Sequence, residues 1–212
     1  MVINSPDAIK KALKSKSFKV AIFGSARIKE TDKSYKEIYK LAKMIGQRDI
    51  DLVTGEGPGL MKAANAGHTA GRNSDHIKSI GLLINIPHER KETKWLDGEN
   101  KAKWLDIEHM FARFSDRLDN FMLLSNAVVV APGGIGTMLE LFYTWQLMQA
   151  QKIRHIPVIL LGDMWPDFLR WMRQHPLRYG FIDKSDLKLL HVAKNAEEAM
   201  RILEKEHKRY RN

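Results

Sequence analysis

The sequence predicts an α/β protein, a Rossmann-like doubly wound parallel sheet with helices on both faces. Strand-like and helix-like segments alternate along the 212 residues, and the strand-like segments are continuous apolar runs. Strands of a parallel sheet are buried on both faces and therefore read as apolar runs, and right-handed crossovers through helices connect them. Glycine-rich turns follow three of these runs, at the position where such sheets bind ligands.

Short apolar runs rich in β-branched residues predict seven strands. They occupy residues 18–23, 49–54, 79–84, 105–107, 127–131, 156–161 and 189–193. A glycine, a proline or a polar residue follows each run, which is typical of a strand end.

Apolar residues at helical spacing predict seven helices around these strands. They occupy residues 6–16, 32–47, 59–70, 110–124, 135–150, 165–174 and 195–208. In the second helix, for example, Ile38, Leu41 and Ile45 fall on one face. Pro6 suits the first turn of the N-terminal helix. The polar and charged segment 87–103 is expected to form a loop or lid.

Length and composition indicate one globular domain over residues 1–212, with residues 1–17 as an N-terminal helical extension. Cysteine is absent, which excludes disulfides, thiolate nucleophiles and cysteine-ligated metals. Met1–Lys19 lacks the apolar core of a signal peptide, and no apolar run reaches the roughly 18 residues of a membrane span. We therefore expect a cytoplasmic protein without a membrane partner. The net charge of +10 favours anionic partners such as nucleotides, phosphosugars or nucleic acid.

The most informative stretch is Pro132–Glu140, which follows an apolar run and reads Pro-Gly-Gly-Ile-Gly-Thr-Met-Leu-Glu. A glycine turn that opens a helix presents unpaired backbone N–H groups with partial positive charge, which suits a phosphate. The turn matches neither the GxGxxG dinucleotide fingerprint nor a Walker loop. A tight connection without any ligand is the alternative. Two further glycine turns at the same end of the sheet, 24–27 and 55–59, favour the ligand.

Glu140 is the one charged residue between Asp119 and Lys152. Its neighbours on the expected helix are apolar and predict burial: Leu139, Leu141, Phe142, Trp145, Leu147 and Met148. A buried carboxylate is costly unless it is paired or used in chemistry, so Glu140 is a catalytic candidate. The structural alternative is a capping box, because Thr137 and Glu140 fit the pattern T-x-x-E.

Arg117 lies at the edge of the apolar side of the helix expected over 110–124, and Arg113 lies one turn before it. Residues four apart share a helix face, so both guanidinium groups are expected on one side. A planar guanidinium suits a phosphate or the charge of a transition state. Pairing of Arg117 with Asp116, Asp119 or another surface acid is the alternative.

Together these segments resemble the LOG family, which is also described as "possible lysine decarboxylase". The family motif PGGxGTxxE stands at residues 132–140, and Thr54–Met61 is similar to the segment TGGGPGLM. Phe23–Arg27 resembles the first phosphate-side turn, and Thr144–Leu147 and Gly180–Ile182 also have counterparts. The resemblance covers nearly the whole chain.

The resemblance implies a Rossmann-like homodimer that acts as a nucleoside 5′-monophosphate phosphoribohydrolase. The family reaction releases adenine, or an N6-modified adenine (a cytokinin), together with ribose 5-phosphate. Arg117 and Glu140 stand at the positions of the family's catalytic pair. The residues expected at the substrate and its phosphate are Gly24, Ser25, Gly55, Gly57, Gly133, Gly134, Ile135, Gly136, Thr137 and Arg113.

No metal and no cofactor are expected. The eight histidines lack the spacing of metal ligands, and we expect them in loops or at the surface. Despite the decarboxylase label, no lysine is singled out as a Schiff-base residue with a pyridoxal phosphate site.

The leading interpretation is hydrolysis of the N-glycosidic bond of AMP or of an N6-modified AMP. The 5′-phosphate would rest on the amides of 134–137, and Glu140 would stabilise positive charge on the ribose or orient the attacking water. The second interpretation is a non-catalytic carrier of a nucleotide or phosphorylated cofactor. It is motivated by two departures from the family pattern: Leu118 replaces a lysine, and Glu56 replaces a glycine.

Single-stranded nucleic acid is a third interpretation that rests on the basic charge, and we do not expect it to be the partner. The helices expected over 110–124 and 135–150 carry more apolar surface than one sheet face requires. We therefore expect these two helices to contact a second subunit.

Overall fold

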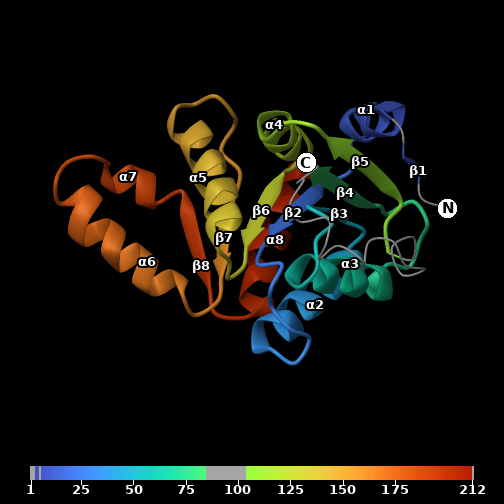
Figure 1. The fold of residues 1–212 in the computed structure, drawn as a ribbon, viewed down its shortest axis with the longest axis horizontal. Helices are drawn as coiled ribbons and strands as arrows, with labels where there is room; N and C mark the ends of the chain where they lie inside the picture. Colours follow the sequence, from blue (N-terminus) through green and yellow to red (C-terminus); the bar gives the residue numbers. More distant parts are fainter. Residues whose placement is uncertain (1–2, 5, 85–103, 212) are drawn as a thin grey trace.

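The structure, a computed structural model, describes residues 3–4, 6–84 and 104–211. These residues form one eight-stranded sheet with helices on both sides (Figure 1). The loop or lid expected at 87–103 lies outside the described residues. Among the helices of the described part, none has both the length and the apolarity that a bilayer crossing needs.

The described strands follow the order β1-β5-β4-β3-β2-β6-β7-β8, and all neighbours are parallel. Their bounds are β1 (Ile3–Asn4), β2 (Lys19–Phe23), β3 (Asp51–Thr54), β4 (Ser79–Ile84), β5 (Ile107–Phe111), β6 (Ala127–Val130), β7 (Val158–Leu161) and β8 (Leu190–Ala193). From β2 the strands β3, β4 and β5 are added on one side of the sheet, and β6, β7 and β8 are then added on the other. This confirms the doubly wound parallel sheet that the apolar runs predicted.

The helices lie between and after the strands. Their bounds are α1 (Pro6–Lys14), α2 (Lys33–Gly46), α3 (Leu60–Gly71), α4 (Phe114–Leu124), α5 (Ile135–Gln149), α6 (Trp165–Met172), the π-helix η4 (Arg173–Leu177), α7 (Lys184–Leu187) and α8 (Ala196–Arg211).

Two apolar cores sandwich the sheet. Helices α2, α3 and α8 cover one face, and α1, α4, α5 and α6 cover the other. Because side chains alternate along a strand, β2 sends Val20 and Ile22 into the first core, and Ala21 and Phe23 into the second. This double burial explains why the strands read as continuous apolar runs.

The N-terminal segment is joined to this sheet. The strand β1 pairs with β5 at the sheet edge, and Ile9 and Ala12 of α1 are buried in the core beside α4. The expected helix over 6–16 is therefore present as α1, whereas β1 is too short to leave a periodic signal in the sequence.

The helix expected over 110–124 begins too early. Residues 107–111 form β5, paired in register with β4, and α4 begins at Phe114. Phe111 and Phe114 are three residues apart and imitate helical spacing, but Phe111 is a buried strand residue and Phe114 is 49% exposed. The short helix α7 and the π-helix η4 were not predicted, because neither spans enough residues to show an apolar period.

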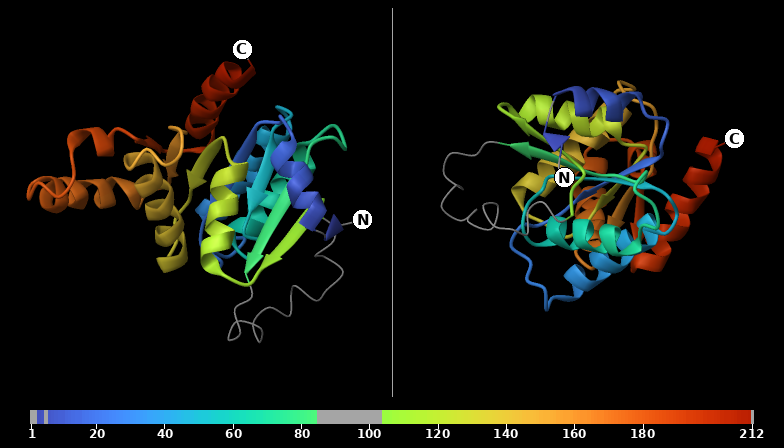
Figure 2. Two further views of the ribbon diagram at one scale, coloured as in Figure 1. Left: turned by 90° about the horizontal axis from the view of Figure 1, so that it is seen from above. Right: turned by 90° about the vertical axis from the view of Figure 1, so that its right-hand side faces the viewer.

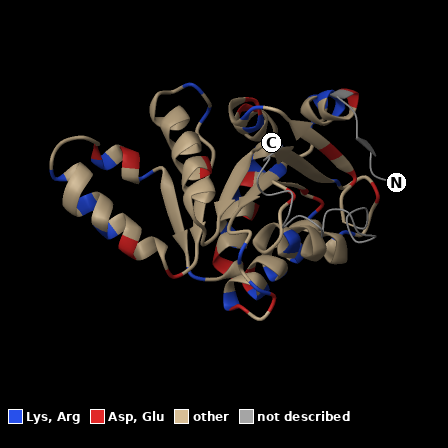
Figure 3. Ribbon diagram, in the orientation of Figure 1, with Lys and Arg blue, Asp and Glu red and all other residues tan. Residues whose placement is uncertain are grey.

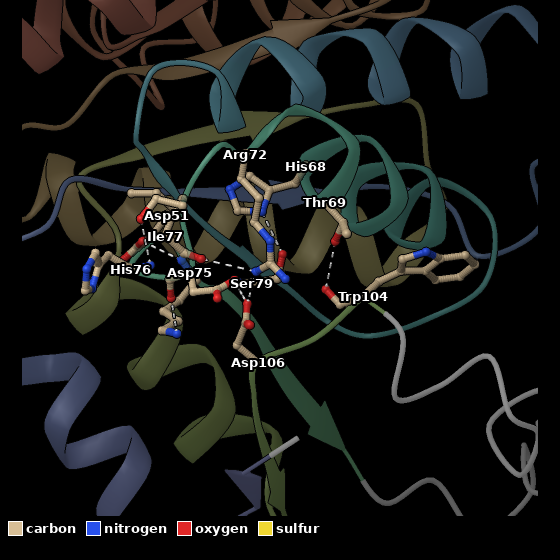
Figure 4. A network of polar contacts seen from close by, with 12 residues as sticks. Asp51, His68, Thr69, Arg72, Asp75, His76, Ile77, Ser79, Trp104 and Asp106 are labelled. Carbon is tan, nitrogen blue, oxygen red and sulfur yellow. Dashed lines mark hydrogen bonds and ion pairs between the residues drawn. The ribbon is translucent and has the colours of Figure 1, made fainter. Parts of the chain in front are cut away.

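A buried polar network lies at the edge of the sheet where the strands begin (Figure 4). The ring nitrogens of His68 lie 2.8 Å from the Ser79 hydroxyl and 2.9 Å from the carbonyl oxygen of Ile50. Asp106 accepts from the Ser79 N–H at 2.8 Å and pairs with Arg72. His68 is fully buried, so its expected place in a loop or at the surface is wrong. Burial lowers the pKa of His68, and the network ties α3 to the sheet.

The segment from α6 to α7 projects from the body of the molecule in Figure 1 and in the left view of Figure 2. It carries exposed aromatic side chains at Trp171, Tyr179 and Phe181. The segment lies beside β7 and β8, at the end of the sheet far from α1.

Candidate active site at the carboxyl edge of the sheet

The three glycine-rich turns meet at the carboxyl edge of β2, β3 and β6. Backbone bonds join them through Ser25: its N–H donates to the Pro132 carbonyl at 3.0 Å, and its carbonyl accepts from the Leu60 N–H at 3.0 Å. The Ser25 hydroxyl accepts from the Arg27 N–H. Gly59, at φ +63°, lies against the backbone of Ser25, where any Cβ would collide. The strands β2 and β6 flank the point where the winding reverses, which is the usual ligand position in such sheets.

The N-terminus of α5 is open to solvent at this edge. Gly134 is its N-cap, and a Cβ built on Gly134 or Gly136 would meet no described atom within 4 Å other than its chain neighbours and the nearby backbone of its own helix. Ile135 is 88% exposed. The first backbone N–H groups of a helix have no intrahelical acceptor, so this end can bind an anion.

Thr137 does not cap the helix. The N-cap is Gly134, which makes no side-chain capping bond, and Thr137 lies in the first turn. Its buried side chain fills the space beside Gly133, where an added Cβ would lie 2.1 Å from Oγ1. The capping-box alternative for Thr137 and Glu140 is therefore wrong.

Arg117 and Glu140 form a pair between α4 and α5. Nη1 of Arg117 lies 3.6 Å from Oε1 of Glu140, with side chains 10% and 12% exposed. Nε of Arg117 donates to the Leu82 carbonyl of β4 at 2.7 Å. Its guanidinium also lies 5.1 Å from the centroid of the buried Phe121 ring. The alternative pairing of Arg117 with Asp116 or Asp119 is not what the structure shows.

Burial raises the pKa of Glu140 to about 7, although the positive charge of Arg117 acts in the opposite direction. A carboxyl group with this pKa exchanges protons near neutrality, which suits acid–base or charge-stabilising work. Leu141, Trp145 and Met148 around it are buried as expected. Leu139 and Phe142 are 44% and 42% exposed, so the expected burial is wrong for these two. Apart from Glu140, α5 is uncharged over its whole length (Figure 3).

The second glycine turn lies against the pair. A Cβ on Gly55 would stand 2.1 Å from Nη2 of Arg117, and the Gly57 N–H donates to Sδ of Met61 at 3.2 Å. Protein side chains thus occupy the space over both glycines that the sequence predicted for the substrate. Gly24 is likewise enclosed, since its Cβ would be 2.9 Å from Leu60.

Arg113 does not share a helix face with Arg117. It is the N-cap of α4, in extended conformation, and it is exposed, whereas Arg117 is buried one turn further on. The expected common side is therefore wrong, because the helix begins after Arg113.

The two departures from the family pattern are both buried. Leu118 packs in the core, so no charge follows Arg117 at this point. Glu56 adopts φ +53° and turns its carboxylate toward Gly81 of β4, whose missing side chain leaves it room.

A second contact between α4 and α5 escaped the sequence interpretation. The Tyr143 hydroxyl donates to the Asp119 carboxylate, which raises the pKa of Tyr143 to about 12. Tyr143 lies three residues after Glu140, and Asp119 two after Arg117. The spacing of Tyr143, one helical turn after the motif glutamate, was the sequence signal that could have indicated this contact.

The chain is similar to known proteins in sequence and in fold. The chain is 26% identical over 148 residues to the Escherichia coli protein described as "Pyrimidine/purine nucleotide 5'-monophosphate nucleosidase". That stretch covers 68% of this chain and 30% of the relative, so the chain spans less than a third of the relative's length.

Two solved structures of similar architecture are molybdenum cofactor proteins. The molybdenum cofactor binding protein from Rippkaea orientalis has a TM-score of 0.62 and 20% identity, over 91% of this chain and 98% of that one. The molybdenum cofactor carrier protein from Chlamydomonas reinhardtii has a TM-score of 0.62 and 21% identity, over 90% and 98%. At such identities the likeness shows the fold alone.

Residues 61–203 match the family described as "Possible lysine decarboxylase". The match covers more than half of the 212 residues and includes both members of the buried pair, Arg117 and Glu140. The chain therefore belongs to the "Possible lysine decarboxylase", or LOG, family that its motif at 132–140 indicated.

Proposed function

We propose that this protein hydrolyses the N-glycosidic bond of a purine nucleoside 5′-monophosphate, AMP or an N6-modified AMP, to a free base and ribose 5-phosphate. The observation that carries the proposal is the pairing of Arg117 with Glu140 beside the open N-terminus of α5. An anion seat and an enclosed carboxylate next to each other suit a substrate that joins a phosphate to a ribose.

The phosphate would bind the first amides of α5. Gly134 and Gly136 leave the space above these amides free, and the helix dipole favours an anion there. The Thr137 hydroxyl lies against Gly133 at the floor of this seat, within the same turn.

Glu140 would act on the ribose. Cleavage of the C1′–N bond leaves its electron pair on the base nitrogen and positive charge on the sugar ring, and a water then adds to C1′. The carboxylate form of Glu140 stabilises this charge or accepts a proton from the water. One proton ends on the departing base. Arg117 favours the ionised form of Glu140 and offers donors to the phosphate.

The Escherichia coli relative supports this choice of reaction, because its description names a nucleotide 5′-monophosphate nucleosidase. The aligned stretch covers 68% of this chain and 30% of that protein, so the substrate is a proposal for this chain and is tested directly.

The test is a panel of nucleoside 5′-monophosphates, incubated with the purified protein and analysed for free base by chromatography. Release of adenine from AMP, lost in the Glu140→Gln variant, supports the proposal. If no nucleotide in the panel releases its base, the hydrolase proposal fails.

A carrier role without turnover is the second candidate. The buried Leu118 leaves Arg117 without a following cation, and the buried Glu56 adds a carboxylate beside the second turn. The two molybdenum cofactor proteins of similar fold are described as binding or carrying their ligand. Calorimetric binding of a nucleotide without base release would favour this role, and steady turnover of AMP would reject it.

A further inference from the structure

The space over Gly55 is filled by Arg117. A Cβ at this position would lie 2.1 Å from Nη2 and 3.4 Å from Cζ of the guanidinium. Among the described glycines, positive φ occurs at Gly59, Gly162 and Gly180, so the backbone of Gly55 does not itself require a glycine. What it requires is the absence of a side chain under Arg117.

Two other groups also contact the same guanidinium. The Leu82 carbonyl accepts from Nε at 2.7 Å, and the Phe121 ring lies 5.1 Å away. Phe121 is fully buried and packs edge-on against Phe23 of β2, at 4.9 Å between centroids. The backbone of β4, the turn after β3 and helix α4 thus form one seat for the Arg117 guanidinium.

We propose that Gly55 is a positioning residue: its bare backbone completes the seat that sets the Arg117 guanidinium against Glu140. This inference rests on the proposed function, in which Arg117 and Glu140 act together. It differs from the expectation that Gly55 contacts the substrate phosphate, because the guanidinium already occupies that position.

The matched comparison is Gly57, two residues along the same turn. A Cβ there would lie 2.0 Å from Cε of Met61 and would not meet Arg117 among its nearest atoms. Gly55→Ala and Gly57→Ala therefore add the same methyl group to one turn, but only the first moves the guanidinium. In both variants the displaced atoms belong to the ends of flexible side chains.

The first measurement does not depend on activity. Carboxyl carbons of labelled protein are titrated by NMR, and the Glu140 signal is assigned with Glu140→Gln. Arg117 is the charged group that lowers the pKa of Glu140, while Asp119 on the facing helix is engaged with Tyr143. We expect Gly55→Ala to raise the Glu140 midpoint and Gly57→Ala to leave it in place.

The second measurement is kinetic. Displacing a catalytic group by about 1 Å costs on the order of 10²-fold in rate. We expect Gly55→Ala to lower kcat for AMP by about 10²-fold, with the dissociation constant of ribose 5-phosphate changed by less than about threefold. A loss of ribose 5-phosphate affinity with an unmoved Glu140 titration would overturn the inference and return Gly55 to the phosphate site.

A double-mutant cycle with Arg117→Lys isolates the contact, because lysine lacks the Nη2 atom that the methyl group strikes. In that background Gly55→Ala should no longer move the Glu140 titration. If Gly55→Ala alone fails to fold, recovery of the fold by Arg117→Lys supports the seat, and no recovery overturns it. If the wild-type protein releases no base, the proposed function is wrong. The Glu140 titration would still test whether Gly55 positions Arg117.

Discussion

Nη1 of Arg117 and Oε1 of Glu140 lie 3.6 Å apart, with about nine-tenths of each side chain withdrawn from solvent. Their separation exceeds a hydrogen bond, so the attraction does not fully offset the cost of burying the carboxylate. This balance explains why the pKa of Glu140 stays raised, to about 7, beside a permanent cation. At neutral pH the ionised and the protonated form of this carboxyl group are therefore both populated.

Replacing Glu140 with glutamine should abolish most of the turnover and leave binding intact. Removing a charge-stabilising or proton-accepting group costs on the order of 10²–10⁴ in rate. The measurement is kcat for AMP hydrolysis beside the calorimetric affinity for ribose 5-phosphate. Glu197→Gln, on the exposed surface of α8, is the matched control and should keep full activity. Unchanged kcat in Glu140→Gln would remove Glu140 from the mechanism.

The pH dependence of kcat/KM should show an acid limb near pH 7. The carboxylate is the working form in the proposed mechanism, so activity rises as pH passes the pKa of Glu140, about 7. Because Arg117 lowers that pKa, Arg117→Gln should move the acid limb to higher pH and also reduce the rate. An acid limb that stays in place in Arg117→Gln would show that the limb reports another group.

Stability should respond to pH in the opposite sense. Between the ordinary pKa of 4.5 and about 7, folded Glu140 keeps a proton that the unfolded chain has lost, so the free energy of unfolding falls as pH rises. The loss amounts to about 3 kcal/mol at most. Glu140→Gln resembles the protonated form and should match wild type near pH 4 but exceed it by about 1–3 kcal/mol at pH 8. Denaturant unfolding at both pH values gives the comparison, and equal stability at pH 8 would contradict it.

Gly136 should tolerate alanine structurally but not functionally. Outside its chain neighbours and the nearby backbone of its own helix, no described atom lies within 4 Å of the added Cβ, and alanine favours a helix over glycine by up to about 1 kcal/mol. Thermal stability should therefore stay or rise. A methyl group in the open seat meets the phosphate instead, so affinity for ribose 5-phosphate should fall at least about tenfold. Gly133→Ala is the contrast, because its Cβ strikes Thr137 and costs stability first.

The sequence predicted those parts of the fold that are apolar along their whole length. The strand β6 and the helix α5 read correctly because each is apolar along its length and a glycine turn separates them. The start of α4 was misread, since Phe111 and Phe114 imitate a helical period that pairing between β5 and β4 overrides. The local spacing of apolar residues gives no information on pairing between strands that are far apart in the sequence.

The candidate site was predictable to the same extent. The motif marked Glu140, and its lack of charged neighbours suggested burial, which the structure supports with a side chain 12% exposed. The seat of Arg117 was not predictable, because Leu82 and Gly55 belong to other elements and reach Arg117 only in the folded sheet. For the same reason the sequence predicted Gly55 as a phosphate-binding residue. A glycine that makes room for a ligand cannot be distinguished in the sequence from one that makes room for an arginine side chain.

We propose that the exposed apolar stripe on α5 contacts a second copy of the chain. Ile135, Leu139 and Phe142 recur at helical spacing and are 88%, 44% and 42% exposed. A stripe of this kind on an otherwise uncharged helix favours association through apolar burial. Sedimentation at micromolar concentration should show a dimer, and Leu139→Glu should give a monomer with the fold retained. Leu13→Glu, at an exposed leucine of α1, should leave the dimer intact. A wild-type monomer at that concentration would contradict the proposal.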